Sequence, residues 1–391
     1  MRLAHAPTNI GEQFEVLLVN ARHSKAVPGR KTDQKRCRAV RIKMLAREVM
    51  KRFVLLSIFL AAVLIALPFR AARSGAAATP APRRSFEFTC DVHVPAIPAG
   101  RHTLRVWIPL PQTAKHQRIN NLRIESPVGY REGRDARYGD RFAYLDVDSG
   151  SAGRAAFDIR MTFDAQRDEY KVALPAGDPA ASNSFPPDVA QYLQPDRLVP
   201  MNGMIGELSS EQTAGVTDPL AKARKIYEYV IAHMHYDHDG TGWGHGDAIW
   251  ACTSHHGNCT DFHSLFIGMA RAAGIPARFE IGFAIPPAQS EGKLSSYHCW
   301  AEFYIQRVGW VPIDAAEAWQ NPPRHDYYFG ALDADRVRFT QGRDLVLNPA
   351  PAGGPLNYFV YPVVQIDGSA FTGATQEFSF RDLPVVQGSE K

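Results

Sequence analysis

The sequence of residues 258–276 predicts a buried helix with a defined start and end. Asn258 is a strong N-cap residue, and Asp261 follows three positions later in the first turn. Gly274 and Pro276 then end the helix. One helical face carries the apolar residues Phe262, Leu265, Phe266, Met269 and Ala270. A helix with such a face needs a large apolar surface to pack against, so this stretch is expected to lie inside a folded domain.

Strand patterns follow this helix and place it in an α+β domain. We expect strands at 277–283, 297–305 and 310–313, and a second helix upstream that begins at Asp218-Pro219. The core domain is therefore predicted over 218–320. Further strand patterns in 321–391 are expected to complete that core.

The region before this core reads as a separate all-β domain. Apolar residues alternate along 86–94, 104–108 and 157–163, with glycine and proline between the runs. This pattern predicts a sandwich-type domain over 86–170. Residues 171–217 are rich in Pro, Ser and Asp without a clear period, and we interpret them as a connecting segment.

The first 84 residues have a different character. Residues 1–52 hold thirteen Lys/Arg against four Asp/Glu, so they are expected to be disordered or to precede the true start of translation. An apolar run at 53–67 then predicts a signal peptide, or a membrane anchor through 53–69, with a linker up to 84. We therefore expect an exported protein, periplasmic or secreted and in the second case membrane-anchored.

The charge balance of the remaining chain restricts its partners. The whole chain has a net charge of +4, but its first 52 residues carry a larger positive charge than that. Residues 53–391 are therefore mildly acidic. This balance argues against nucleic acid as a partner. A peptide or protein substrate is expected instead.

A cysteine, a histidine and an aspartate occupy positions that suit nucleophilic catalysis. Cys259 directly follows the helix cap, where unpaired N–H groups favour a thiolate and can lower a thiol pKa from about 8.5 to roughly 3.5–7.5. His298 starts a strand, and Asp314 ends the next one, so a hairpin brings them near each other in a register that the sequence does not fix. The predicted roles are nucleophile, general base and acid, and orienting carboxylate.

Four motifs around these residues resemble the bacterial transglutaminase-like superfamily. They are G-N-C-T-D-F-H-S-L-F (257–266), A-R-A-A-G-I-P-A-R (270–278), Y-H-C-W-A-E-F (297–303) and G-W-V-P-I-D (309–314). The resemblance implies a papain-like core with a Cys-His-Asp triad at Cys259, His298 and Asp314, and it extends to exported members with an N-terminal β-domain. It also implies acyl transfer on amide bonds through a thioester. We favour hydrolysis, as in a cysteine peptidase or amidase, with protein-glutamine transglutaminase activity as the alternative. No cofactor and no metal are expected.

Other interpretations of the same residues stay open at this point. Cys252, His255, His256, Cys259 and His263 cluster densely enough to suggest a zinc site instead. A binding module without catalytic activity is another alternative. Asn258, Trp250 and Trp300 are candidates for the cleft wall or the oxyanion site. Export would also permit a disulfide between Cys252 and Cys299.

Overall fold

The computed structural model describes residues 81–176 and 184–384. The predicted basic start at 1–52, the apolar run at 53–67 and most of the linker lie outside these ranges. None of the helices within them is long and apolar enough to cross a membrane.

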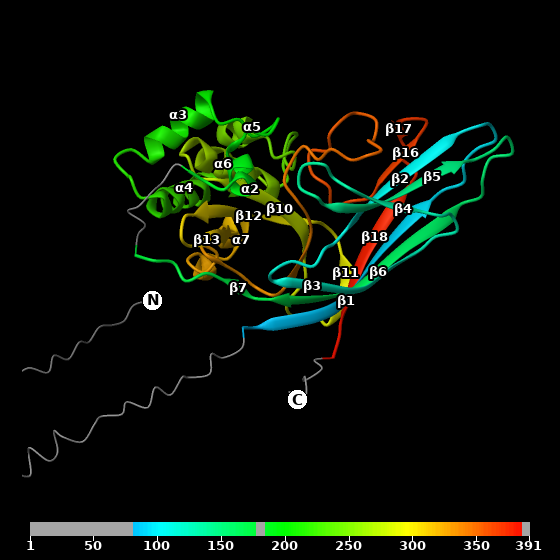
Figure 1. The fold of residues 1–391 in the computed structure, drawn as a ribbon, viewed down its shortest axis with the longest axis horizontal. Helices are drawn as coiled ribbons and strands as arrows, with labels where there is room; N and C mark the ends of the chain where they lie inside the picture. The colour runs from blue at the N-terminus through cyan, green and yellow to red at the C-terminus, as the bar shows by residue number, and fades with distance from the viewer. Residues whose placement is uncertain (1–80, 177–183, 385–391) are drawn as a thin grey trace, which may run out of the picture. The chain divides into compact units, whose positions relative to one another are not determined.

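Two five-stranded antiparallel sheets make up the β-rich part of the molecule (Figure 1). One has the strand order β11-β18-β1-β6-β3, and the other has the order β17-β16-β2-β5-β4. The strands contributed by the N-terminal region are β1 Arg83–Val94, β2 Thr103–Leu110, β3 Gln117–Glu125, β4 Arg131–Arg134, β5 Arg141–Asp148 and β6 Phe157–Asp168.

The predicted alternation in the first strand is confirmed. Its inward side chains Phe86, Phe88, Cys90, Val92 and Val94 are all buried. The polar residues between them are more exposed, as expected for a strand with one face on a core.

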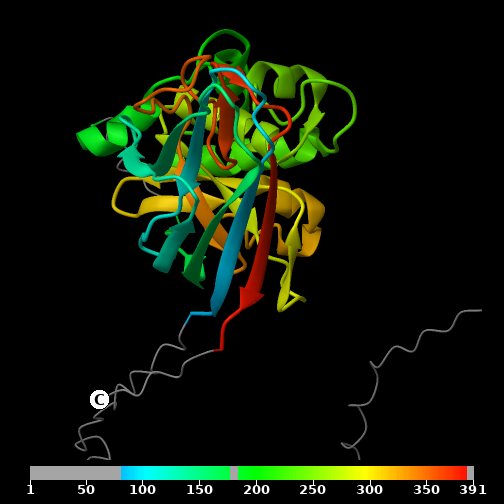
Figure 2. The ribbon, with the colours of Figure 1, turned by 90° about the vertical axis from the view of Figure 1, so that its right-hand side faces the viewer.

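The last strands of the chain, β16 to β18, belong to these two sheets, which corrects for them the prediction that the strands of 321–391 complete the core. β18 runs antiparallel to β1, with Phe86 opposite Asp382, and Figure 2 shows the blue β1 and the red β18 side by side. β16 pairs in the same way with β2. The strands that join from later parts of the chain are β11 Glu291–Leu294, β16 Val363–Ile366, β17 Ser369–Ala370 and β18 Thr375–Asp382.

A four-stranded antiparallel sheet with the order β13-β12-β10-β15 forms the α+β core. Its strands are β10 Ala277–Ala284, β12 His298–Ile305, β13 Gly309–Ile313 and β15 Arg336–Gln341. The main helices are α3 Gly203–Gln212, α4 Pro219–His233, α5 Ala248–Ser254, α6 Cys259–Ala272 and α7 Ala315–Gln320. Shorter elements are β7 Tyr170–Lys171, α2 Pro187–Ala190, η1 Gln191–Leu193, β8 His235–Tyr236, β9 His256–Gly257, η2 Pro322–Arg324 and β14 Ala331–Leu332.

The segment 171–217 is more than the connection that its composition predicts. It contains α3, whose Ile205 is completely buried. Gly268 of α6 faces it so closely that a Cβ at this glycine would lie 3.1 Å from the Ile205 side chain. Most polar residues of α3 point outward, and its apolar face is too short to give a clear period.

The β-rich part and the α+β core share one hydrophobic interior. Residues 79–391 form a single compact unit. The ring of Phe88 on β1 lies 5.2 Å from that of Phe283 on β10 and 5.4 Å from that of Phe339 on β15. Two separate domains at 86–170 and 218–320 are therefore the wrong division, because the inner face of the β1 sheet packs on the core sheet.

Candidate active site

A capping box fixes the first turn of α6. The Asn258 side-chain oxygen accepts a hydrogen bond of 2.9 Å from the Thr260 N–H, and the Asp261 carboxylate accepts one of 2.9 Å from the Asn258 N–H. The other contacts of Asp261 are to the N–H groups of Gly244 and Gly246, at 2.7 and 2.9 Å. The loop before α5 is thus tied to the helix start, and the backbone of Cys259 is held in place.

Strand register brings His298 and Asp314 together. Ala301 pairs with Ile313 across β12 and β13, so Asp314 continues on the side of Trp300, and His298 lies two residues further along the same face. The His298 Nε2 atom lies 2.7 Å from Asp314 Oδ2. Because the carboxylate only accepts, Nε2 carries the proton of this bond and Nδ1 is left for the thiol.

Asp314 is a buried anion with several donors. Arg336 Nη1 donates to its Oδ2 at 2.9 Å, and the Glu317 N–H at the start of α7 donates to its Oδ1 at 3.0 Å. Burial by itself would raise the pKa of Asp314, but the charges of His298 and Arg336 outweigh it and hold that pKa far below its usual range. The carboxylate therefore stays ionised and can keep a positive charge on His298.

The thiol and the imidazole shift in opposite directions. Burial would raise the pKa of Cys259, but hydrogen bonds from Cys299 and His298 and the charge of His298 lower it well below its ordinary value. Burial would likewise lower the pKa of His298, but Asp314 and Cys259 raise it well above its ordinary value. A thiolate beside an imidazolium is the state that these shifts favour.

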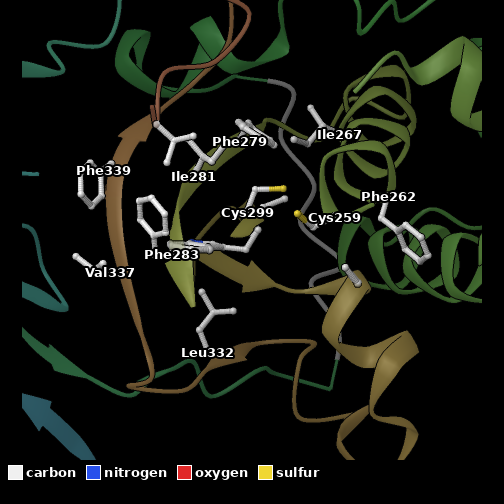
Figure 3. Close-up of a cluster of buried hydrophobic side chains, with 14 of the residues drawn as sticks. Cys259, Phe262, Ile267, Phe279, Ile281, Phe283, Cys299, Leu332, Val337 and Phe339 are labelled. Carbon is white, nitrogen blue, oxygen red and sulfur yellow. The ribbon is translucent and has the colours of Figure 1, made fainter. Parts of the chain in front are cut away.

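Cys299 and His263 are neighbours of Cys259, although the sequence suggested them only as a disulfide partner and as a zinc ligand. Figure 3 shows the sulfur atoms of Cys259 and Cys299 pointing toward each other. His263 is completely buried, with its Nδ1 3.5 Å from the Cys299 sulfur and its Nε2 accepting the Ala315 N–H at 3.0 Å. The sequence signal for them is their position in the motifs. His263 lies one helical turn after Cys259, and Cys299 lies one residue after His298.

The other cysteine prediction is not met. Cys252 and Cys299 are both free thiols, so no disulfide joins them. Cys252 is half-buried on α5, whereas Cys299 is completely buried on β12 against α6.

The three candidates for the cleft wall or oxyanion site have different surroundings. Asn258 is used as the helix cap, and its amide nitrogen donates to the Tyr297 hydroxyl at 3.0 Å. Trp300 is completely buried and its indole N–H donates to Glu280 at 2.9 Å, which makes it a wrong choice for an oxyanion donor. Trp250 is half-buried with its ring edge-on to His256, and its role in a cleft stays a prediction.

The residues of the alternative zinc site are not brought together. His256 is paired with Asp237 at 2.9 Å, and His263 accepts a backbone N–H. His255 ends α5 in the left-handed conformation. In the described ranges, a group whose ligand atoms meet closely enough for a metal ion is found at Glu228, His325 and Asp326, and it includes none of the five predicted residues.

Cys259 and His298 are buried, and aromatic side chains pack around the first turns of α6. Cys259 is 1% exposed and His298 is 6% exposed. The Tyr236 ring packs at a tilt against Phe262 of α6, and the Tyr297 hydroxyl lies 2.7 Å from the Thr260 hydroxyl at the start of that helix. In such surroundings, the charges of the imidazolium and the carboxylate act more strongly than they would in water.

The fold and the site together define a papain-like α+β core with a cysteine at a helix start. Residues 206–315 match the transglutaminase-like superfamily. This segment contains all four motifs, so the match confirms the resemblance that they predicted.

Two relatives extend beyond the core. An uncharacterized protein of Haemophilus influenzae is 29% identical over 330 residues, which cover 72% of this chain and 85% of the relative. A solved structure of a proposed cysteine protease from Cytophaga hutchinsonii superimposes with a TM-score of 0.54 at 18% identity, over 78% of this chain and 93% of that one. This second likeness shows that the β-rich part and the core recur together as one fold.

Proposed function

We propose that the protein is a cysteine-dependent amide hydrolase that acts on peptides or proteins through a thioester. The observation that carries the proposal is the buried His298–Asp314 pair at 2.7 Å beside Cys259, since it goes with a raised pKa of His298 and a lowered pKa of Cys259 and so favours a thiolate–imidazolium pair. A structural cysteine in an apolar interior would have a raised pKa, as Cys90 does.

The reaction follows from the positions of the protons. The Cys259 thiolate attacks the amide carbonyl, and the tetrahedral intermediate collapses when the His298 imidazolium gives its proton to the leaving amine. This step forms the thioester and releases the amine. Neutral His298 then takes a proton from water, whose oxygen attacks the thioester and releases the acid and the thiolate. Asp314 holds the imidazole orientation throughout.

The backbone N–H of Cys259 is our proposed oxyanion donor. The N–H groups of Thr260, Asp261 and Phe262 are all used by Asn258. The N–H of Cys259 donates to no described residue, so it is the free donor of this helix turn. The oxyanion forms next to the nucleophile, so a free N–H at this position can donate a hydrogen bond to it.

Water is the acyl acceptor that we favour. The Cytophaga hutchinsonii protein with the same fold is described as a proposed cysteine protease, which supports hydrolysis. Transfer to a primary amine uses the same thioester and is the alternative outcome of the test below. We place the reaction outside the cytoplasm because the apolar run at 53–67 has the length of a signal sequence.

A two-product assay tests this proposal. The protein is incubated with casein and a fluorescent primary amine, and both peptide release and amine incorporation are measured. We expect peptide release without incorporation, and loss of release in Cys259→Ser but not in Cys252→Ser. Incorporation of the amine without peptide release would indicate a transferase instead of a hydrolase. Release that survives Cys259→Ser would contradict the proposal.

A further inference from the structure

A polar pocket lies on the face of the core sheet opposite α6. It has a volume of about 560 Å³ and lies where β6 and β7 meet the core sheet. Five basic side chains and two carboxylates line it: Lys115, Arg167, Lys171, Arg278, Arg338, Glu280 and Glu302. We call it the Arg167 pocket. It contains none of the three predicted triad residues.

The two carboxylates of this pocket already have partners. Glu302 accepts a hydrogen bond of 2.8 Å from Arg278, and Glu280 accepts one of 2.8 Å from Arg338. The second oxygen of Glu280 accepts the indole N–H of Trp300. Both glutamates are therefore matched by two arginines, and Arg167 is left over.

Arg167 is a buried cation without a partner. It continues the inward face of β6 after Phe163 and Ala165, and it is only 4% exposed. It donates no hydrogen bond to any described residue, forms no ion pair with them, and its Nε is fully buried without a partner. Burial and the nearby charge of Arg336 lower its pKa to about 10. A buried charge in this position is costly unless an anion pairs with it.

A second unpartnered polar atom faces the same pocket. His116 also lines it, stacked on Tyr170 with ring centroids 3.9 Å apart, and its Nε2 is buried without a partner. Burial and the charge of Arg167 lower the pKa of His116 to about 4, so the ring is neutral near pH 7. A neutral imidazole offers one donor or one acceptor to a bound molecule without adding a competing charge.

We propose that the Arg167 pocket binds an anionic small molecule whose carboxylate or phosphate group pairs with the Arg167 guanidinium. The planar guanidinium donates two parallel hydrogen bonds to either oxyanion. The pocket volume lies in the range of small-molecule sites and exceeds what a single inorganic ion fills. Tyr170 and Trp310 also line the pocket and add apolar surface for the rest of the ligand.

Thermal unfolding of the full chain tests this site with defined anions. Sodium phosphate and sodium acetate are titrated against sodium chloride at equal ionic strength, so that general salt effects cancel. We expect a saturating rise in Tm with one or both anions. In Arg167→Met the apparent Kd should rise by about tenfold or more, because a charged hydrogen-bond donor is lost. Arg167→Lys keeps the charge but loses the two parallel guanidinium donors, so it should bind the anion more weakly than the wild type does.

A matched variant separates the site from surface charge. Arg160→Met removes an arginine from the same strand, where it is exposed and paired with Asp91 at 2.6 Å. It should respond to anions as the wild type does. A response to phosphate alone indicates a phosphorylated ligand, and a response to acetate alone indicates a carboxylic acid. The proposal is overturned if neither anion raises the wild-type Tm beyond chloride, or if Arg167→Met and Arg167→Lys respond like the wild type.

Discussion

Replacing Asp314 by asparagine removes one charge from the centre of the site and leaves its shape almost unchanged. Asp314 Oδ2 lies 2.7 Å from His298 Nε2. At an effective dielectric constant of about 20, this pair attracts by about 6 kcal/mol, an upper bound because desolvation opposes it. An opposite charge this close typically changes a pKa by about 1–3. The pKa of His298 should therefore fall by that amount in Asp314→Asn, and the pKa of Cys259 should rise.

The measurement is the pH dependence of Cys259 alkylation by iodoacetamide, followed by peptide mass spectrometry. The midpoint for wild type should lie well below the ordinary thiol pKa and move up by about 1 to 3 pH units in Asp314→Asn. The amide also turns an N–H toward the Glu317 N–H, which costs about 1–3 kcal/mol of unfolding free energy. Thermal unfolding therefore accompanies each profile, so that only folded variants are compared.

An exposed histidine–aspartate pair at the same distance gives the control. His93 and Asp158 also lie 2.7 Å apart, but at the surface, with side chains 49% and 73% exposed. Asp158→Asn should leave both the alkylation midpoint and the Tm unchanged. A folded Asp314→Asn protein with the wild-type midpoint would refute the argument that this carboxylate sustains the ion pair.

Three further predictions concern the neighbours of the ion pair. Cys299→Ala removes a thiol donor to Cys259, so the alkylation midpoint should rise by about 1 pH unit or less, and Cys299→Ser should restore it. Arg336→Met breaks a buried ion pair and should lower the free energy of unfolding by about 3–5 kcal/mol in urea titrations, whereas the exposed Arg160→Met should change it by at most about 1 kcal/mol. The lowered pKa of Asp314 stabilises the fold above the usual Asp pKa of about 4, and this stabilisation is lost as the pH falls through the folded value. The difference in Tm between wild type and Asp314→Asn should therefore shrink as the pH falls below about 4, and a constant difference there would contradict the assignment.

Local patterns predicted the parts of the site that local physics controls. The start of α6 could be read because Asn258 and Asp261 form a capping box within four residues. The inward face of β1 could be read because its burial alternates strictly. The hairpin that carries His298 and Asp314 was also expected, but its register depends on how the short turn after Ile305 closes.

The pairing of strands far apart in the chain could not be predicted from the sequence. β18 returns to pair with β1 from the other end of the chain, and its pattern is the same whichever sheet receives it. The contact of Arg336 with Asp314 could not be predicted for the same reason, because it depends on β15 pairing with β10 in the core sheet. Arg167 did leave a signal, because a charged residue occupies the core-facing register of β6. The conflict between its charge and its position is what the Arg167 pocket explains.

The central claim is that Cys259 is a thiolate held by His298. The most direct measurement compares the alkylation rates of Cys259 and Cys252 at pH 6 in the wild type and in His298→Ala. The pKa of the half-buried Cys252 is raised by burial, so this thiol is the internal reference. We predict that Cys259 reacts first in the wild type and loses this advantage in His298→Ala. Equal rates for the two cysteines in the wild type, or an unchanged Cys259 rate in folded His298→Ala, would contradict the account.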